Sequence, residues 1–426
     1  MSVHLNDLDR SMRDGDLGEA TRFAMSVVVR TAGAVEASDL ISVEQAHVDA
    51  CALMSESNLE FVRRLVEQGG RVRVPTTLNM VSLDLEHWEE LGVPREFADR
   101  ATRIAKSYRE LGCVPTWTCA PYQGYLSPRF GQQIAWGESN AVVYANSVLG
   151  ARTNRYPDFL DVCAAITGRV PNAGLHRTEN RRGELVVRVP ETSKASWSSP
   201  SAWAVLGHAI GELAGERIPV IVGLPRPAMG EQLKALGAAA ASSGSVEMFH
   251  AVGITPEAPD LETALHGAKD AEELDLTREM LAGTWDRMSS AAEGEKLDAV
   301  ILGCPHFSYA EFEALAAEIS ALGPGRVRPD VQFLVLSDSP SLALASRGGL
   351  IEGIREFGAT IALDTCPFHS PIVTERASAV MTNSGKCAYY APAELGASVA
   401  LGTMRDCVRS AVTGVVTREE TPWNGP

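Results

Sequence analysis

The chain has 426 residues, of which 45% are hydrophobic and 22% are charged, as is typical of a folded globular protein rather than a disordered one. So long a chain rarely builds a single hydrophobic core, and we expect more than one domain. The formal net charge of −16 disfavours nucleic acid or an anionic membrane surface as the main partner. No apolar run approaches the roughly 20 residues of a membrane span. The acidic N-terminal stretch is unlike a signal peptide, so a cytoplasmic protein is expected.

The N-terminal half shows an irregular mixture of helical and extended patterns. Hydrophobic periodicity predicts extended segments at 41–48 and 72–75 and helices at 17–32, 59–68, 96–111 and 139–149. A Ser-rich stretch at 192–200 ends in proline and is typical of a linker. We therefore expect an N-terminal α/β domain at 1–195 and a C-terminal region at 196–426.

The C-terminal half alternates short β-rich apolar runs with helical stretches. The predicted strands are 218–223, 299–303, 332–337, 360–363 and 379–382, and the predicted helices are 231–241, 273–291, 309–321 and 341–357. Strands that are apolar on both faces and alternate with helices are typical of a parallel, doubly wound α/β architecture. In such folds ligands bind at the carboxyl ends of the strands. We therefore expect an active site at these strand ends, between domains.

Two of the eight cysteines lie at such strand ends. Cys304 directly follows AVILG, and Cys366 follows IALDT. Each precedes a proline, which is expected to end its strand. Cysteines at two equivalent strand ends favour a shared functional site over core packing. Cys119, in PTWTCAPY, has no comparable signal, and the other five cysteines (51, 113, 163, 387 and 407) are interpreted as core residues.

The densest polar segment is 136–155, WGESNAVVYANSVLGARTNR. Its apolar middle predicts a helix, which Ser139 or Asn140 could cap, leaving amides that suit a carboxylate. Asn146 lies among apolar neighbours, where an amide needs a partner. Arg152 lies in the polar flank that follows.

Two further polar clusters follow predicted extended segments. PTTLN at 75–79 contains Thr77, and TNSGK at 382–386 contains Ser384 and Lys386, which could pair with a substrate anion. His47, His176, His306 and His369 are possible bases or ligands. Glycine-rich nucleotide motifs and the Gly-x-Ser-x-Gly motif of α/β-hydrolases do not occur in the sequence.

Widely separated cysteines together with hydroxyl, amide and cationic groups suggest an iron–sulfur cluster with one position left open. Such an iron is a Lewis acid that can hold a substrate hydroxyl and make it a leaving group. This chemistry predicts a dehydratase rather than an electron carrier.

At these residues the chain resembles the aconitase X family, specifically its large, catalytic subunit. The resemblance is carried by six segments between residues 73 and 392: RVPTTLNMVSLDLEHWEELGVP, TCAPY, WGESNAVVYANSVLGARTNR, LGCPH, LDTCP and TNSGKCAYYAP. It implies an aconitase-like multi-domain α/β fold. It also implies a cluster, 2Fe–2S, 3Fe–4S or 4Fe–4S, held by Cys119, Cys304 and Cys366. For Cys119 the role rests on the resemblance alone.

The resemblance also implies a reaction and a partner. Bacterial members dehydrate cis-3-hydroxy-L-proline to Δ1-pyrroline-2-carboxylate, and archaeal members dehydrate mevalonate 5-phosphate. The stretch RYPDFLDVCAAITGRVP is similar to the bacterial version, so a hydroxyproline-type hydroxy acid is the expected substrate. The family also uses a small swivelling domain, and we expect a separate small aconitase X subunit to supply it.

In this interpretation Arg152 and Lys386 neutralise the substrate carboxylate. Four polar residues orient the substrate: Thr77, Ser139, Asn140 and Asn146. The candidates for the catalytic base are Ser384, His47 and Glu138. Two other hypotheses stay open: a cluster-free enzyme with a nucleophilic Cys304 or Cys366 beside His306 or His369, and a non-catalytic iron–sulfur sensor.

Overall fold

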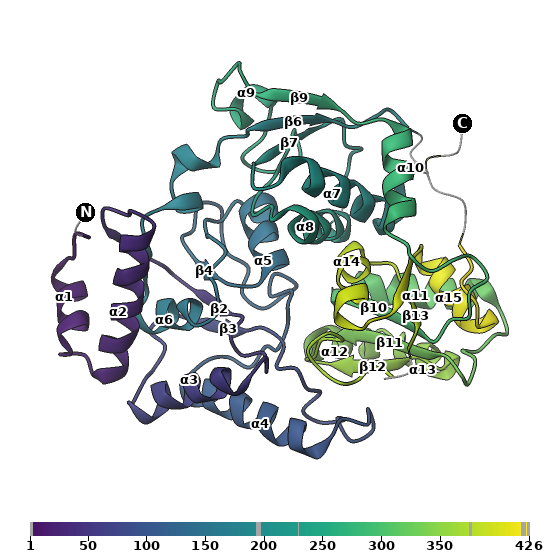
Figure 1. Cartoon of the computed structure of the whole chain (residues 1–426), viewed down its shortest axis with the longest axis horizontal. Coiled ribbons are helices and arrows are strands. Elements are labelled where there is room, and N and C mark those ends of the chain that lie inside the picture. The colour runs from purple at the N-terminus through teal and green to yellow at the C-terminus, as the bar shows by residue number, and fades with distance from the viewer. Residues whose placement is uncertain (1–2, 193–196, 229, 375–376, 419–422, 424–426) are drawn as a thin grey trace.

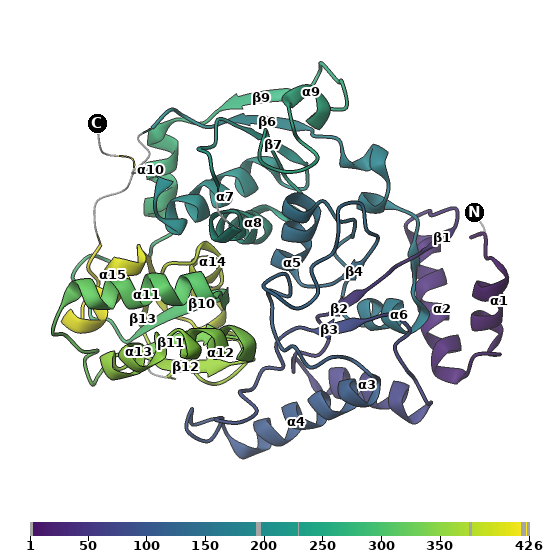
Figure 2. The same ribbon diagram turned by 180° about the vertical axis from the view of Figure 1, so that it is seen from behind.

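The computed structural model describes residues 3–192, 197–228, 230–374, 377–418 and 423. The expected domain boundary at 195/196, and part of the expected linker, lie outside these residues. The described chain forms three α/β bodies around a common centre (Figure 1), and Figure 2 shows the same arrangement from behind. Among the described residues, every helix is too short or too polar to cross a lipid bilayer.

The first body contains a small parallel sheet of order β3-β2-β4, formed by β2 (Ala46–Val48), β3 (Thr76–Leu78) and β4 (Ala135–Trp136). A separate antiparallel pair joins β1 (Leu40–Ser42) to β5 (Arg169–Pro171). The surrounding helices are α1 (Asp7–Asp14), α2 (Glu19–Ala34), α3 (Glu56–Glu67), α4 (Arg95–Glu110), α5 (Ser139–Tyr144), η1 (Ala145–Leu149), α6 (Leu160–Thr167), η2 (Gly174–His176) and η3 (Thr178–Arg181).

The second body is built on a parallel sheet of order β8-β7-β6-β9. Its strands are β6 (Leu185–Arg188), β7 (Pro219–Val222), β8 (His250–Ala251) and β9 (Glu272–Asp275). Its helices are α7 (Pro200–Ala214), α8 (Gly230–Gly244), α9 (Leu261–Ala264) and α10 (Arg278–Arg287).

The third body has a parallel sheet of order β12-β11-β10-β13-β14. Its strands are β10 (Ala299–Phe307), β11 (Gln332–Ser337), β12 (Thr360–Leu363), β13 (Ala379–Thr382) and β14 (Ser398–Leu401). Its helices are α11 (Tyr309–Leu322), α12 (Ser339–Arg347), α13 (Ile351–Phe357), α14 (Gly385–Glu394) and α15 (Met404–Thr413). The expected α/β class with parallel layers is confirmed.

Several predicted elements differ in their limits. Residues 72–75 are not a strand, because the ladder to β2 forms at β3. The predicted helix 273–291 begins with strand β9, and α10 starts only after Thr277, whose hydroxyl caps it. The predicted helix 341–357 is two helices, because Gly349 between them has a φ of +72°.

The prediction that proline ends the strand at Cys304 is wrong. Strand β10 continues to Phe307, and its register against β11 shifts between Leu302 and Phe307. The irregular stretch accommodates Pro305, whose missing N–H is not needed there. The predicted helix 139–149 is α-helical only to Tyr144, and η1 that follows is a π-helical turn.

The helices α7 and α8 of the second body approach each other closely through glycine. A Cβ at Gly207 would collide with the backbone carbonyl of Leu236 on α8. A Cβ at Gly211 would collide with the hydroxyl of Ser243. The backbones therefore meet where a larger residue has no room.

We expect Gly207→Ala to lower the free energy of unfolding by about 1–3 kcal/mol, because the new methyl group overpacks the α7–α8 contact. Gly353→Ala on α13, where a Cβ meets nothing within 4 Å, is the matched control. It should be neutral or stabilise the helix by up to about 1 kcal/mol. Urea denaturation of both variants measures the difference, and equal stabilities would contradict this packing.

Candidate active site

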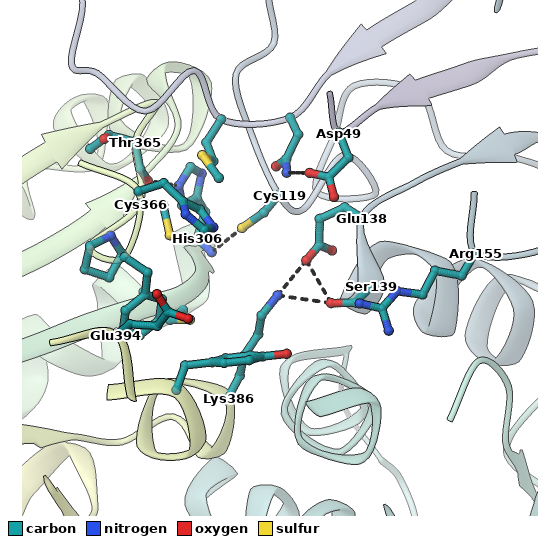
Figure 3. A pocket seen from close by; sticks show the side chains of 18 residues that line it. Asp49, Cys119, Glu138, Ser139, Arg155, His306, Thr365, Cys366, Lys386 and Glu394 are labelled. Carbon is teal, nitrogen blue, oxygen red and sulfur yellow. Dashed lines mark hydrogen bonds and ion pairs between the residues drawn. The ribbon is translucent and has the colours of Figure 1, made fainter. Parts of the chain in front are cut away.

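A cavity of about 230 Å³ lies where the first and third bodies meet (Figure 3). Asp49 and Asn79 line it and directly follow β2 and β3, and Glu138 lies two residues after β4. From the third body, Cys304 on β10 and Cys366 after β12 line the same cavity. Two parallel sheets thus point their carboxyl-terminal edges at one space, which is where α/β folds bind ligands.

The structure brings the three cysteines singled out from the sequence to this cavity. Burial raises the pKa of the Cys304 thiol to about 11, although Lys386 opposes the shift. Burial, together with the neighbouring Cys304, raises the pKa of the Cys366 thiol to about 12. Burial also raises the pKa of the Cys119 thiol, which accepts a hydrogen bond from the backbone N–H of His306 at 3.3 Å. Without a bound cation these thiols are protonated at neutral pH.

The three thiols line the cavity, but they do not converge on one position where a single metal ion could bind to all of them. Among the described residues, no group of three His, Cys, Asp or Glu side chains is arranged to hold a single metal ion. Their sulfurs come from three segments of the chain that are far apart in sequence.

Glu138 and Lys386 form a buried ion pair across the cavity, with Nζ 2.5 Å from Oε1. Burial would raise the pKa of Glu138, but the charge and hydrogen bond of Lys386 outweigh it, so this pKa lies below its usual value. The backbone N–H of Ala141 also donates to this carboxylate at 2.8 Å. Burial would lower the pKa of Lys386, and Glu138 instead raises it. Both side chains are therefore charged at neutral pH.

Asp49 is another carboxyl group of the cavity, and its environment has the opposite effect on its pKa. Burial raises its pKa to about 7, the carboxylates of Glu138 and Asp158 add to the shift, and Asn79 and Lys386 oppose it. The Asn79 side-chain amide donates to Asp49 Oδ1. The backbone N–H of Asp49 donates to Asp161 Oδ2 at 2.6 Å, which fixes the main chain. Two carboxyl groups of one cavity thus have pKa values pushed apart.

Three predicted residues lie behind the cavity wall. His47 is fully buried on β2, where its Nδ1 contacts the Thr77 hydroxyl at 2.8 Å. Burial lowers the pKa of His47 to about 4, so its ring is neutral. Ser384 caps α14 by accepting from the Cys387 N–H at 3.1 Å, and its hydroxyl donates to the Cys304 carbonyl. None of His47, Thr77 and Ser384 is among the residues that line the cavity.

Three further predicted residues stabilise the surroundings. Asn140 donates to the Cys119 carbonyl at 2.9 Å and so holds the loop that carries this thiol. Asn146 is buried and exchanges hydrogen bonds with the backbone of Thr153. Arg152 donates to the His176 carbonyl at 3.2 Å and to the Thr178 hydroxyl at 2.8 Å. Of the predicted substrate-binding residues, Ser139 and Lys386 line the cavity, and Asn140, Asn146 and Arg152 do not.

Sequence reasoning missed several residues of the cavity. Asp49 and Asn79 directly follow strands, so the rule that identified Cys304 would have found them. Tyr390 and Glu394 lie four and eight residues after Lys386 on α14, and this spacing places all three on one helical face. Arg155 lies three residues beyond the predicted Arg152 in a segment without helical structure, and only the fold shows that it is Arg155 that reaches the cavity.

Comparisons with known proteins agree with this architecture. Family models for the first, second and third domains of aconitase X match residues 2–179, 183–286 and 297–413. The crystal structure of Thermococcus kodakaraensis aconitase X in its holo-form superposes with a TM-score of 0.86 and is 31% identical in sequence. That match covers 96% of this chain and 100% of the other.

Curated relatives include enzymes of two kinds. The chain is 42% identical over 414 residues to a cis-3-hydroxy-L-proline dehydratase of Pseudomonas aeruginosa, covering 96% of this chain and 70% of the relative. It is 40% identical to the same enzyme of Hypocrea jecorina, covering 97% and 69%. It is 34% identical to the phosphomevalonate dehydratase large subunit of Methanosarcina mazei, covering 97% and 98%. The resemblance seen in the sequence motifs is confirmed: the chain belongs to the aconitase X family, and these relatives are dehydratases, that is, hydro-lyases.

Proposed function

We propose that this chain catalyses the dehydration of cis-3-hydroxy-L-proline to Δ1-pyrroline-2-carboxylate. The observation that carries the choice of substrate is sequence identity. The two hydroxyproline dehydratases are 40–42% identical to the chain, whereas the phosphomevalonate dehydratase large subunits are 29–35% identical.

Mevalonate 5-phosphate is the alternative substrate, and the charges of the cavity argue against it. Among the described residues that line the cavity, the Lys and Arg side chains are Lys386 and Arg155. Lys386 is already paired with Glu138. Arg155 then suits a single carboxylate better than a carboxylate together with a phosphate.

We propose further that Cys119, Cys304 and Cys366 hold an iron–sulfur cluster, of the 2Fe–2S, 3Fe–4S or 4Fe–4S type. Two observations support the fit: the three thiols line one cavity, and the backbone N–H of His306 donates to the sulfur of Cys119 at 3.3 Å. A bound cation deprotonates such thiols despite their burial. When bound, a cluster with an open iron position supplies a Lewis acid that polarises the C–O bond.

The side chains of this chain supply proton transfer and orientation. Arg155 and Ser139 hold the substrate carboxylate at the wall formed by α5. Glu138, ionised through its pair with Lys386, accepts the proton from C2, and the C2–H electron pair forms the C2–C3 double bond. The C3–O bond breaks, and Asp49 gives its proton to the departing oxygen, which leaves as water. The enamine product then tautomerises to the Δ1 imine.

We also propose that a separate small aconitase X subunit covers the cavity. The chain spans about 70% of the length of the two hydroxyproline dehydratases, but 98% of a relative named as a large subunit. Arg155 and Glu394 line the cavity and are exposed, so this side of the cavity is open to a second chain. Such a subunit would exclude water during the reaction.

A cluster-free cysteine enzyme is disfavoured by the protonation of its thiols. The pKa values of Cys304 and Cys366 are raised by burial, whereas a nucleophilic cysteine needs a lowered one. Both ring nitrogens of His306 are hydrogen-bonded, to Thr118 and Thr365, so this ring is not free to deprotonate a thiol.

The proposed reaction is tested by anaerobic purification of the chain together with a small aconitase X subunit. The complex is offered cis-3-hydroxy-L-proline and mevalonate 5-phosphate in parallel. We expect turnover of cis-3-hydroxy-L-proline but not of mevalonate 5-phosphate. Chromatography measures the product, Δ1-pyrroline-2-carboxylate. Turnover of the phosphorylated compound alone would contradict the choice of substrate.

We expect Cys304→Ser to abolish both the visible absorbance of the cluster and turnover, because a serine hydroxyl is a poor ligand for this soft site. Cys163→Ala is the matched control, since Cys163 is a buried cysteine of α6 outside the cavity. Iron and sulfide analysis of both variants measures the loss. Full activity in Cys304→Ser would reject the cluster.

We expect kcat/KM to fall as the pH rises through about 7, because the protonated form of Asp49 is lost there while Glu138 stays ionised. Asp49→Asn should lose roughly 10²- to 10⁴-fold in rate, the usual contribution of a proton-transfer residue.

Asp158→Asn is the control for this pH dependence. The Asp158 carboxylate raises the pKa of Asp49, so its removal should keep activity and move the fall in rate to lower pH. An Asp49→Asn enzyme with the wild-type rate at pH 7 would exclude the proton-donor role.

A further inference from the structure

His306 lies in the segment that carries Cys304 and makes polar contacts with the segments that carry the other two cavity cysteines. It lies two residues after Cys304, at the irregular end of β10, and its side chain is almost fully buried. Its peptide N–H, both ring nitrogens and its carbonyl all have partners. The reaction proposed above gives this residue no part in proton transfer.

The peptide N–H of His306 donates directly to the sulfur of Cys119, with N and Sγ 3.3 Å apart. Figure 3 shows this contact on the cavity wall. A backbone donor stabilises negative charge on a thiolate and tunes a group bound to it. The contact also fixes the distance between the segment of Cys304 and the loop of Cys119.

The imidazole ring joins the other two cysteine segments. Its Nε2 lies 2.8 Å from the carbonyl oxygen of Thr365, the residue before Cys366. A carbonyl oxygen can only accept, so Nε2 carries the hydrogen. Its Nδ1 lies 3.2 Å from the hydroxyl of Thr118, the residue before Cys119. One ring thus bridges the loop of the first body and the strand end of β12.

The carbonyl of His306 is held in turn by a buried lysine from the second body. Lys234 on α8 is only 4% exposed, and its Nζ donates to the His306 oxygen at 2.9 Å. The same ammonium donates to Gln123 at 3.0 Å and pairs with Glu311 at 2.5 Å. Gln123 also donates to the His306 oxygen at 3.1 Å. All three bodies therefore meet at this carbonyl.

We propose that His306 is a positioning residue that fixes the three cysteine segments relative to one another, and that Lys234 anchors it from behind. This inference rests on the proposed cluster, because it concerns the residues that would hold it. His306 acts through the segments it joins rather than on the substrate. Its loss would leave three thiols that are present but no longer held in one arrangement.

The test compares His306→Ala, which loses both ring contacts, with His306→Gln, which keeps a donor near the position of Nε2. His176→Gln is the matched control, because His176 is also buried with both ring nitrogens hydrogen-bonded, to Tyr156 and Gln133, and lies outside the cavity. Each holoenzyme is reconstituted with limiting iron and sulfide, and bound iron and the visible spectrum are measured.

We expect iron affinity to fall by roughly 10- to 100-fold in His306→Ala, as for other residues that orient metal ligands, with His306→Gln intermediate and His176→Gln unchanged. Circular dichroism shows which variants fold. If His306→Ala does not fold, the iron affinity of His306→Gln tests the proposal. Wild-type iron affinity and spectrum in the folded His306 variants would overturn the proposal.

A second readout separates this inference from the cluster itself. In the iron-free protein, a short bifunctional thiol reagent bridges cysteines that are held close together, and mass spectrometry identifies the bridged pairs. Bridging among Cys119, Cys304 and Cys366 should be slower in His306→Ala than in the wild type or His176→Gln. A wild-type chain that binds no iron would refute the cluster, and equal bridging rates would refute the role of His306.

Discussion

The buried ion pair between Lys386 and Glu138 joins the two walls of the cavity, and the electrostatics of the site depend on it. Glu138 comes from the strand ends of the first body and Lys386 from α14 of the third. Removing one partner of such a buried pair typically costs about 3–5 kcal/mol, because the other charge is left without compensation. The pair therefore favours the arrangement in which the two sheet edges face each other.

The same lysine also sets the protonation of its neighbours. For Glu138, Asp49 and the three cavity thiols, burial raises the pKa and the charge of Lys386 opposes that rise. Only for Glu138 does the opposing effect bring the pKa below its usual value. Glu138, in direct contact, becomes fully ionised, whereas Asp49 keeps a pKa of about 7. In the proposed mechanism, this difference makes Glu138 the proton acceptor and Asp49 the proton donor. An acidic chain with a net charge of −16 can thus present a local environment suited to an anionic substrate.

The sequence allowed the α/β class and the position of Cys366 just after its strand to be predicted, because the strands are short apolar runs. Cys304 was expected at a strand end as well, but it lies within β10, which continues to Phe307. Cys119 lies in a loop without periodicity, so only the family resemblance singled it out. Asp49 and Asn79 directly follow strands, so their position at the sheet edge could have been predicted from the same strand-end rule. Arg152 and Arg155 share one polar segment, and which of them reaches the cavity depends on a tertiary contact. His306 was noticed as a histidine, but its contacts join three segments that no local pattern connects.

The most direct measurement of the central claim is anomalous X-ray diffraction at the iron edge from anaerobically grown crystals of the chain with its proposed small subunit. The account predicts iron density within bonding distance of the sulfurs of Cys119, Cys304 and Cys366, about 2.3 Å as in other metal–thiolate bonds. Density at other residues, or none in a complex that still dehydrates its substrate, would contradict it.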